Sequence, residues 1–120
     1  IDGLMANDLH KRYSHVLTGY IGNTKTLRAV LSLVEDLRKS NPNLLYFCDP
    51  VMGDNGKFYV PNDCVEVYRD EVLPASSIIT PNFFEMGILA QTEIVDEASV
   101  LHACDVVHGK GVRCIVMTGL

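Results

Sequence analysis

The sequence predicts an α/β domain in which crossover helices connect the strands of a parallel β-sheet. Short β-rich segments alternate along the chain with segments of helical periodicity, and this alternation is typical of βαβ units. The 120 residues have the size of one ordinary domain. No linker, internal repeat or low-complexity segment divides them, so we expect one structural unit over residues 1–120.

The first half of the chain predicts two helices and two strands. Residues 1–12 have a helical pattern, residues 14–18 form a short apolar run typical of a strand, and residues 19–23 form a loop. Over residues 24–40 the apolar side chains recur at three- and four-residue spacing, which places them on one helix face: Leu27, Val30, Leu31, Val34 and Leu37. Residues 41–43, Asn-Pro-Asn, end this helix before the apolar strand at residues 44–48.

The second half continues the alternation. After an acidic loop, residues 57–60 form a brief extended piece, and a helix begins near Pro61 and runs through Val72, with Pro74 ending it. Residues 77–80 predict a third core strand. Helices at residues 82–91 and 97–110 follow, and residues 114–118 predict a fourth strand.

Composition and charge exclude several classes of protein. The net charge is −5 and the ten Lys and Arg residues are scattered along the sequence. They form no basic stripe that could bind a phosphodiester backbone, so no nucleic-acid partner is expected. No apolar run is long enough to span a membrane. The four cysteines and four histidines lack metal-ligand spacing, which predicts reduced core thiols, no zinc site and a cytoplasmic protein. The opening Ile1-Asp2-Gly3, without an initiator Met, leads us to expect a segment of a longer polypeptide.

The run Cys48-Asp49-Pro50-Val51-Met52-Gly53-Asp54 places two carboxylates just after a predicted strand. In open parallel sheets, ligands bind beyond the carboxyl ends of the strands. Asp49 and Asp54 therefore offer hard oxygen ligands for Mg²⁺ or for water around a metal-bound phosphate. The alternative is purely structural: Asp49-Pro50 ends the strand, and Asn55-Gly56 makes a hairpin turn.

Two further strand ends carry polar side chains. Thr80-Pro81-Asn82-Phe83-Phe84-Glu85 follows the third strand, and Thr118-Gly119 follows the fourth. A helix beginning at Asn82 would attract phosphate through its unpaired N–H groups. The alternative is local capping, because Asn82 and Glu85 have the spacing of a capping box. The convergence of Asp49, Thr80 and Thr118 at one sheet edge nevertheless favours a shared site.

These motifs, in this order, resemble the pyridoxal kinase family, and most closely its eukaryotic branch within the ribokinase-like vitamin and sugar kinases. The resemblance covers essentially the whole chain and rests on five segments: Leu17-Thr18-Gly19-Tyr20, Cys48 to Asp54, Phe58-Tyr59-Val60-Pro61, Ile79 to Glu85, and Val116-Met117-Thr118. The Asp-Pro-Val-Met-Gly and Thr-Pro-Asn motifs are shared with hydroxymethylpyrimidine kinases. The resemblance implies an incomplete ribokinase-like fold, with residues 1–120 as the central part of one kinase domain.

The resemblance also implies a reaction and its ligands. The family transfers the γ-phosphoryl group of ATP to the 5′-hydroxymethyl group of pyridoxal, pyridoxine or pyridoxamine, with Mg²⁺ and a monovalent cation, K⁺ or Na⁺. A homodimer is expected of the complete protein. The alternative within the superfamily is a hydroxymethylpyrimidine kinase.

Site roles follow from the resemblance, position by position. Asp54 would bind Mg²⁺, and Asp49 would lie at the nucleotide phosphates and the monovalent cation. Thr80, Glu85 and Thr118 would help to surround that cation. The nucleotide site would include Asn82, Phe83, Phe84, Glu85, Thr118 and Gly119. Residues 55–60 would form a flap that carries Tyr59, and Tyr20 would face the pyridine substrate.

Two departures from the family pattern limit what this chain can do. Gly119-Leu120 stands where the family has small hydroxyl residues, and the Gly-Thr-Gly-Asp motif that supplies the family's catalytic base does not occur. We therefore expect no catalytic residue in this segment and no activity from it alone.

Two alternatives belong to other classes of protein. One is a nonenzymatic nucleotide-binding remnant. The other is a response-regulator receiver with Asp49 as its phosphoacceptor, although Thr18-Gly19-Tyr20 stands where a receiver needs an acidic pair.

Overall fold

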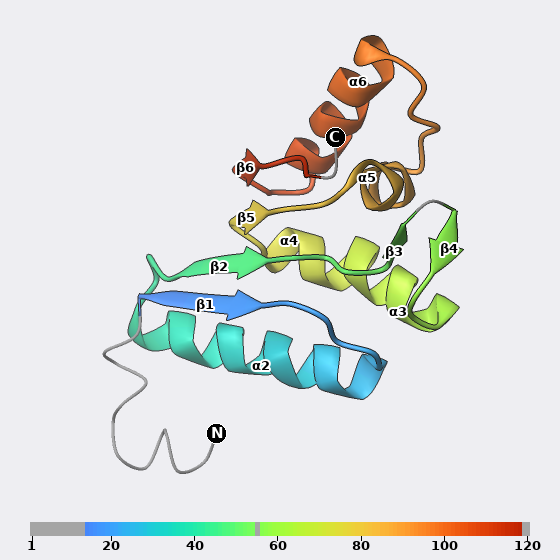
Figure 1. Ribbon diagram of the computed structural model, residues 1–120. Coiled ribbons are helices and arrows are strands. Elements are labelled where there is room, and N and C mark those ends of the chain that lie inside the picture. The colour runs from blue at the N-terminus through green and yellow to red at the C-terminus, as the bar shows by residue number, and fades with distance from the viewer. Residues whose placement is uncertain (1–13, 55, 119–120) are drawn as a thin grey trace.

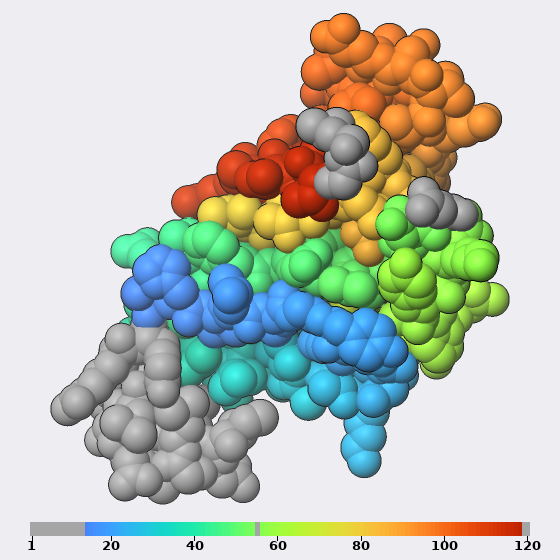
Figure 2. All heavy atoms as spheres, in the orientation of Figure 1, coloured from blue at the N-terminus to red at the C-terminus, as the bar shows by residue number. Residues whose placement is uncertain are grey.

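A computed structural model describes residues 14–54 and 56–118, and its centre is a four-stranded parallel sheet (Figure 1). The strands are β1 (His15–Thr18), β2 (Leu45–Cys48), β5 (Ile78–Ile79) and β6 (Cys114–Ile115), in the order β1-β2-β5-β6. In this register His15 lies opposite Leu45, and Phe47 lies opposite Ile78. The space-filling view shows the blue residues of β1 beside the green residues of β2 (Figure 2). The predicted parallel α/β fold is confirmed.

Helices connect the strands. They are α2 (Thr24–Ser40), α3 (Asn62–Val67), α4 (Leu73–Ala75), α5 (Phe83–Ala90) and α6 (Glu97–Gly109), with one π-helical turn, η2 (Tyr68–Val72), between α3 and α4. A small antiparallel hairpin of β3 (Gly53–Asp54) and β4 (Lys57–Phe58) precedes α3. The helix predicted over residues 1–12 lies outside the described residues.

Local signals account for the ends of α2. The side chain of Asn23 caps its N-terminus by accepting a hydrogen bond of 2.8 Å from the backbone N–H of Thr26. Arg38 and Lys39 stand in its last turn, where positive charge is favourable. The helix therefore has the bounds that its periodicity predicts.

The helix after the hairpin is longer than predicted. Pro74 does not end it at Val72, because the chain widens into the π turn η2 and continues through Ala75. In this turn the N–H of Leu73 bonds to the carbonyl oxygen of Tyr68, five residues earlier. Pro74 has no N–H, so one hydrogen bond of a regular α-helix would be missing here in any case. The wider turn thus accommodates the proline inside the helical segment.

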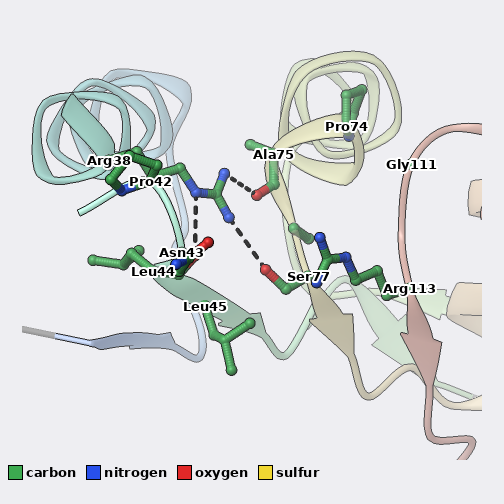
Figure 3. Close-up of a pocket in the computed structure, with 11 residues that line it drawn as sticks. Arg38, Pro42, Asn43, Leu44, Leu45, Pro74, Ala75, Ser77, Gly111 and Arg113 are labelled. Carbon is green, nitrogen blue, oxygen red and sulfur yellow. Dashed lines mark hydrogen bonds between the residues drawn. The ribbon is translucent and has the colours of Figure 1, made fainter.

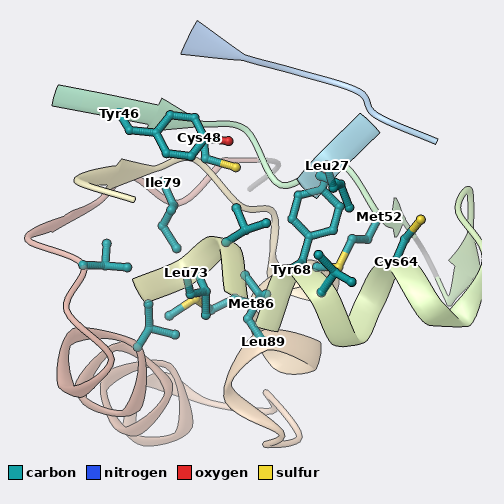
Figure 4. Close-up of a cluster of buried hydrophobic side chains, with 14 of the residues drawn as sticks. Leu27, Tyr46, Cys48, Met52, Cys64, Tyr68, Leu73, Ile79, Met86 and Leu89 are labelled. Atoms are coloured by element: carbon teal, nitrogen blue, oxygen red, sulfur yellow. The ribbon is translucent and has the colours of Figure 1, made fainter. Parts of the chain in front are cut away.

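The helices cover one face of the sheet. Between this face and the helices lies a buried core (Figure 4). The sheet contributes Tyr46, Cys48 and Ile79, and the helices contribute residues that include Leu27, Tyr68 and Met86. On the opposite face Leu17 is 78% exposed. Within the described residues, no helix combines the length and the apolar character needed to span a bilayer.

Candidate functional site

The ends of β1, β2 and β5 form a cavity of about 340 Å³ at the carboxyl edge of the sheet. Asp49 and Thr80 both line it, together with Leu17, Thr18, Gly19, Phe47 and Cys48. Backbone hydrogen bonds place the two polar residues: the N–H of Asp49 donates to Thr18 at 2.9 Å, and the N–H of Thr80 donates to Cys48 at 3.2 Å. The ladder of the sheet thus continues one residue past each strand and brings Asp49 and Thr80 to one cavity.

Thr118 lies beside this edge but does not line that cavity. It forms an isolated parallel bridge with Asn82, and its N–H donates to the carbonyl oxygen of Pro81 at 3.0 Å. The chain just after β6 is therefore adjacent to the start of α5. Gly119, the other predicted nucleotide contact here, lies outside the described residues.

Asp54 is exposed on the β3–β4 hairpin. The hairpin turns through Gly56, whose φ of +79° is a left-handed conformation that favours glycine. A Cβ atom at Gly53 would overlap the carbonyl oxygen of Lys57 and crowd the ring of Phe84. The rings of Phe58 and Phe84 meet edge to face with centroids 5.1 Å apart. The hairpin that carries Asp54 is therefore packed closely against the first turn of α5.

Glu85 joins this hairpin to α5. Its side chain is buried, with 4% of the residue exposed, and its Oε1 accepts from the backbone N–H of Asn82 at 2.9 Å. Its Oε2 accepts from the N–H of Met52 at 2.8 Å and from that of Gly53 at 3.4 Å. The carboxylate therefore serves the helix cap with one oxygen and the loop before Asp54 with the other.

Asn82 makes the reciprocal contacts. Its Oδ1 accepts from the backbone N–H of Glu85 at 2.8 Å, which completes the capping box. Its Nδ2 donates to the carbonyl oxygen of Gly53 at 2.9 Å. Asn82 and Glu85 therefore do form the predicted capping box. The same two side chains also hold the hairpin that carries Asp54. The sequence reasoning missed these loop contacts, although a capping box uses only one oxygen of Glu85, and a buried second oxygen needs a donor.

The predicted aromatic contacts are more dispersed. Tyr59 is 55% exposed beyond β4, and its N–H donates to the carbonyl oxygen of Met52 at 2.7 Å. Tyr20 is 61% exposed in the loop after β1. Phe83 lines a separate shallow cavity with Ile94 and Val100. The structure brings neither tyrosine into the cavity that Asp49 and Thr80 line.

The floor beneath the strand ends is buried and uncharged. Thr18 Oγ1 and the hydroxyl group of Tyr46 form a hydrogen bond of 2.8 Å. Burial raises the pKa of Tyr46. Burial likewise raises the pKa of the Cys48 thiol to about 11. The buried hydroxyl of Tyr68 has no hydrogen-bond partner in the part of the chain that the structure describes. The negative charge of this edge therefore lies on Asp49 and Asp54, at the surface, and on the hydrogen-bonded carboxylate of Glu85.

The carboxylates of Asp49 and Asp54 are the type of ligand that Mg²⁺ takes when it also binds phosphate. Among residues 14–54 and 56–118, no three His, Cys, Asp or Glu side chains gather closely enough to hold a metal by themselves. Mg²⁺ usually keeps several waters and binds through one or two carboxylates plus phosphate oxygens. Asp49 and Asp54 are exposed at the two ends of one loop, so each could contribute such a carboxylate.

Comparison with known proteins agrees with this geometry. The sequence model of the phosphomethylpyrimidine kinase family matches residues 6–120. The chain is 48% identical over 120 residues to pyridoxal kinase of Arabidopsis thaliana, covering 100% of this chain and 38% of that protein. It is 47% identical over 118 residues to pyridoxal kinase of Dictyostelium discoideum, with 98% and 39% covered. The chain thus spans less than half the length of these curated relatives.

Solved structures show the same fold. Pyridoxal kinase from Entamoeba histolytica superposes with a TM-score of 0.90 at 28% identity, over 99% of this chain and 42% of that one. Pyridoxal kinase from Leishmania donovani, in complex with ADP and pyridoxamine, superposes with a TM-score of 0.88 at 39% identity, over 95% of this chain and 40% of that one. The chain therefore belongs to the phosphomethylpyrimidine kinase family of ribokinase-like proteins, and within it to the pyridoxal kinases.

Proposed function

We propose that the protein to which this chain belongs transfers the γ-phosphoryl group of ATP to the 5′-hydroxymethyl group of pyridoxal, pyridoxine or pyridoxamine. The observation that carries the proposal is the shared cavity of Asp49 and Thr80, with the Asp54 hairpin held to α5 by Asn82 and Glu85. Relatives with this sequence pattern are pyridoxal kinases, and solved examples bind ADP with pyridoxamine or pyridoxine, or AMP-PNP.

The proposed roles follow from the chemistry of phosphoryl transfer, which depends on positioning and charge neutralisation more than on covalent chemistry. Asp54 would bind Mg²⁺, and Asp49 would lie at the phosphates and at a monovalent cation, K⁺ or Na⁺. Thr80 and Thr118 would contribute oxygen atoms to that cation, with Glu85 beside them. Asn82, Phe83, Phe84 and Glu85, with Thr118 and Gly119, would line the nucleotide site.

The hairpin and the loop after β1 would complete the site. Residues 55–60 would form a flap over the phosphates, with the exposed Tyr59 on it. Closing such a flap excludes water that would otherwise accept the phosphoryl group. Tyr20, exposed in the loop after β1, would contact the pyridine ring.

The chain is proposed to be the central part of a single kinase domain and to be inactive alone. Proton removal from the substrate alcohol needs a positioned base, and no such base is assigned to any of the 120 residues. The complete protein is proposed to be a cytoplasmic homodimer. Formation of phosphorylated vitamin by the isolated chain would contradict this part of the proposal.

The test is the initial rate of pyridoxal 5′-phosphate formation from pyridoxal and MgATP by the full-length protein. We expect Asp54→Asn to lower this rate by on the order of 100-fold or more, because the carboxylate proposed to hold Mg²⁺, the ion that neutralises the phosphates, is lost. Asp63→Asn is the matched control, since Asp63 is another exposed acid, at the start of α3, and should leave the rate unchanged. Equal rates for the wild type and Asp54→Asn would contradict the metal role.

The second candidate is a hydroxymethylpyrimidine kinase, which the matching family model favours. ADP formation with a hydroxymethylpyrimidine and not with pyridoxal would select it. Nucleotide binding without turnover of either substrate would select a nonenzymatic binding protein.

The receiver alternative is disfavoured by the family and by the strand order. A receiver has the order 2-1-3-4-5, whereas here β1 lies at the end of the sequential order β1-β2-β5-β6. Phosphorylation of Asp49 by acetyl phosphate would be needed to support the receiver alternative.

A further inference from the structure

A second cavity lies at the opposite edge of the sheet (Figure 3). Its volume is about 420 Å³, and its lining includes Leu44 and Leu45 at the start of β2, Ser77 just before β5 and Arg113 just before β6. These are the amino ends of the strands, whereas Asp49 and Thr80 follow the carboxyl ends. The length of a four-residue strand, roughly 13 Å, separates the two cavities.

Arg38 reaches this cavity from the last turn of α2. Its Nε donates to the carbonyl oxygen of Leu44 at 3.4 Å, its Nη1 to that of Ala75 at 2.7 Å, and its Nη2 to Ser77 Oγ at 3.2 Å. All three acceptors are neutral, so the positive charge of Arg38 is not compensated by them. Each Nη atom carries two hydrogens, which leaves one N–H on each for another acceptor.

Arg113 brings a second guanidinium group to the same cavity. Figure 3 shows its side chain beside Ser77, on the side of the cavity across from Arg38. Burial lowers the pKa of Arg38, and the positive charge of Arg113 lowers that pKa further. No Asp or Glu lines the cavity, and within residues 14–54 and 56–118 neither arginine forms an ion pair. Two like charges therefore face one cavity, and the described residues supply no counter-ion for them.

Ser77 adds a hydroxyl group between the two arginines. Its Oγ accepts from Arg38 Nη2 and from the backbone N–H of Tyr46 at 3.1 Å. Its own O–H donates to no group in the described part of the chain, so it is available to an acceptor. The cavity thus presents donors from two guanidinium groups and one hydroxyl group.

We propose that this cavity binds a small phosphate-type oxyanion between Arg38 and Arg113. The planar guanidinium group matches the geometry of phosphate oxygens, and an anion would remove the repulsion between the two charges. None of the described residues that line the cavity is aromatic, so they offer no ring on which a nucleobase or a pyridine would stack. This ligand is therefore distinct from ATP and from vitamin B6, and the proposal does not depend on the proposed kinase activity.

The test is a titration of the full chain with inorganic phosphate, followed by backbone amide NMR at constant ionic strength set with chloride. We expect saturable shifts of the amides of Ser77, Gly111 and Arg113. Arg113→Gln should weaken phosphate binding at least about tenfold, as expected for loss of one charged contact. Arg113 is exposed, and in the described part of the chain its side chain bonds to no residue, so this variant should fold.

Arg28→Gln is the matched control. Arg28 lies on α2, the helix that carries Arg38, and pairs with Glu71 away from the cavity. Its loss should leave phosphate affinity within about twofold. A parallel titration with glycerol 3-phosphate separates two sources of the anion: tighter binding indicates a phosphate ester, and equal binding indicates free phosphate. Shifts confined to residues 82–85, shifts that do not saturate, or equal affinity of Arg113→Gln and wild type would overturn the proposal.

Discussion

The Oε2 atom of Glu85 accepts a hydrogen bond of 2.8 Å from the backbone N–H of Met52, which joins the first turn of α5 to the loop before Asp54. The same carboxylate caps α5 through the N–H of Asn82. One buried side chain therefore satisfies donors of two segments that are far apart in the sequence. The position of Asp54 therefore depends on the bond between Glu85 and Met52.

Glu85→Ala should destabilise the chain more than loss of a helix cap alone. It removes acceptors from three backbone N–H groups, two of which belong to the buried residues Met52 and Gly53. A hydrogen bond to a charged group contributes about 1.5–3 kcal/mol, so we expect a loss of at least about 2 kcal/mol in the free energy of unfolding, measured in urea.

Ser99→Ala is the control for this variant. Ser99 occupies the equivalent position in the capping box of α6, where its bonds are exposed to solvent. Its removal should cost about 0.5–1 kcal/mol. Equal losses for Glu85→Ala and Ser99→Ala would contradict the role of Glu85 in holding the loop.

Gly53→Ala should also loosen the hairpin. The added methyl group would overlap the carbonyl oxygen of Lys57 and press on the ring of Phe84. Because the carbonyl belongs to the paired strand, it cannot move without opening the β3–β4 hairpin. We expect a loss of about 1–3 kcal/mol in unfolding free energy.

The matched control for Gly53 is Gly19→Ala. A Cβ atom at Gly19 meets nothing within 4 Å, so this change should leave the stability nearly unchanged. A stability of Gly53→Ala equal to that of Gly19→Ala would show that the hairpin adapts without cost.

Much of this fold could be predicted because its signals are local. Asn23 and the apolar spacing of α2 define a helix without help from distant residues, and the capping box of Asn82 and Glu85 is a contact three residues apart. The bond between Glu85 and Met52 joins residues 33 positions apart. A sequence pattern can indicate that a carboxylate oxygen needs a donor, but it does not say which loop supplies that donor. The π turn before Pro74 was missed for a related reason, since it depends on packing as well as on the proline.

The stability of α6 should depend on pH through Asp96. Hydrogen bonds from the backbone and side chain of Ser99 lower the pKa of this carboxyl below its usual 3.8. Because the pKa is lower in the folded state, the stabilisation is present above pH 3.8 and is lost as the pH falls through the folded-state pKa. We expect the free energy of unfolding to decrease below about pH 4, and Asp96→Asn to reduce that decrease. Identical pH profiles for the two proteins would contradict the role of Asp96 as a titrating cap.

The cysteines should differ in their reactivity toward iodoacetamide. The Cys48 thiol is buried, and burial raises its pKa to about 11, whereas Cys114 is exposed on β6. The thiolate is the reactive form, so Cys48 should react much more slowly than Cys114 at mildly alkaline pH. Peptide mass spectrometry of the native chain checks this order. Modification of Cys48 as fast as that of Cys114 would show that the floor of the candidate site opens readily.

The role of Glu85 in the complete kinase can be separated into positioning and cation binding. Both of its carboxylate oxygens already accept backbone N–H groups, so we expect it to act mainly by holding the Asp54 hairpin. Glu85→Gln should then weaken MgATP binding by a factor that does not change with the K⁺ concentration. Thr80→Ala removes a proposed ligand of the cation, so its effect on MgATP binding should diminish as the K⁺ concentration is raised. The measurement is the KM for MgATP of each full-length variant across a K⁺ series. If high K⁺ restores the KM of Glu85→Gln as it restores that of Thr80→Ala, Glu85 is a ligand of the cation. Its hydrogen bonds to Met52 and Gly53 would then serve only to orient it.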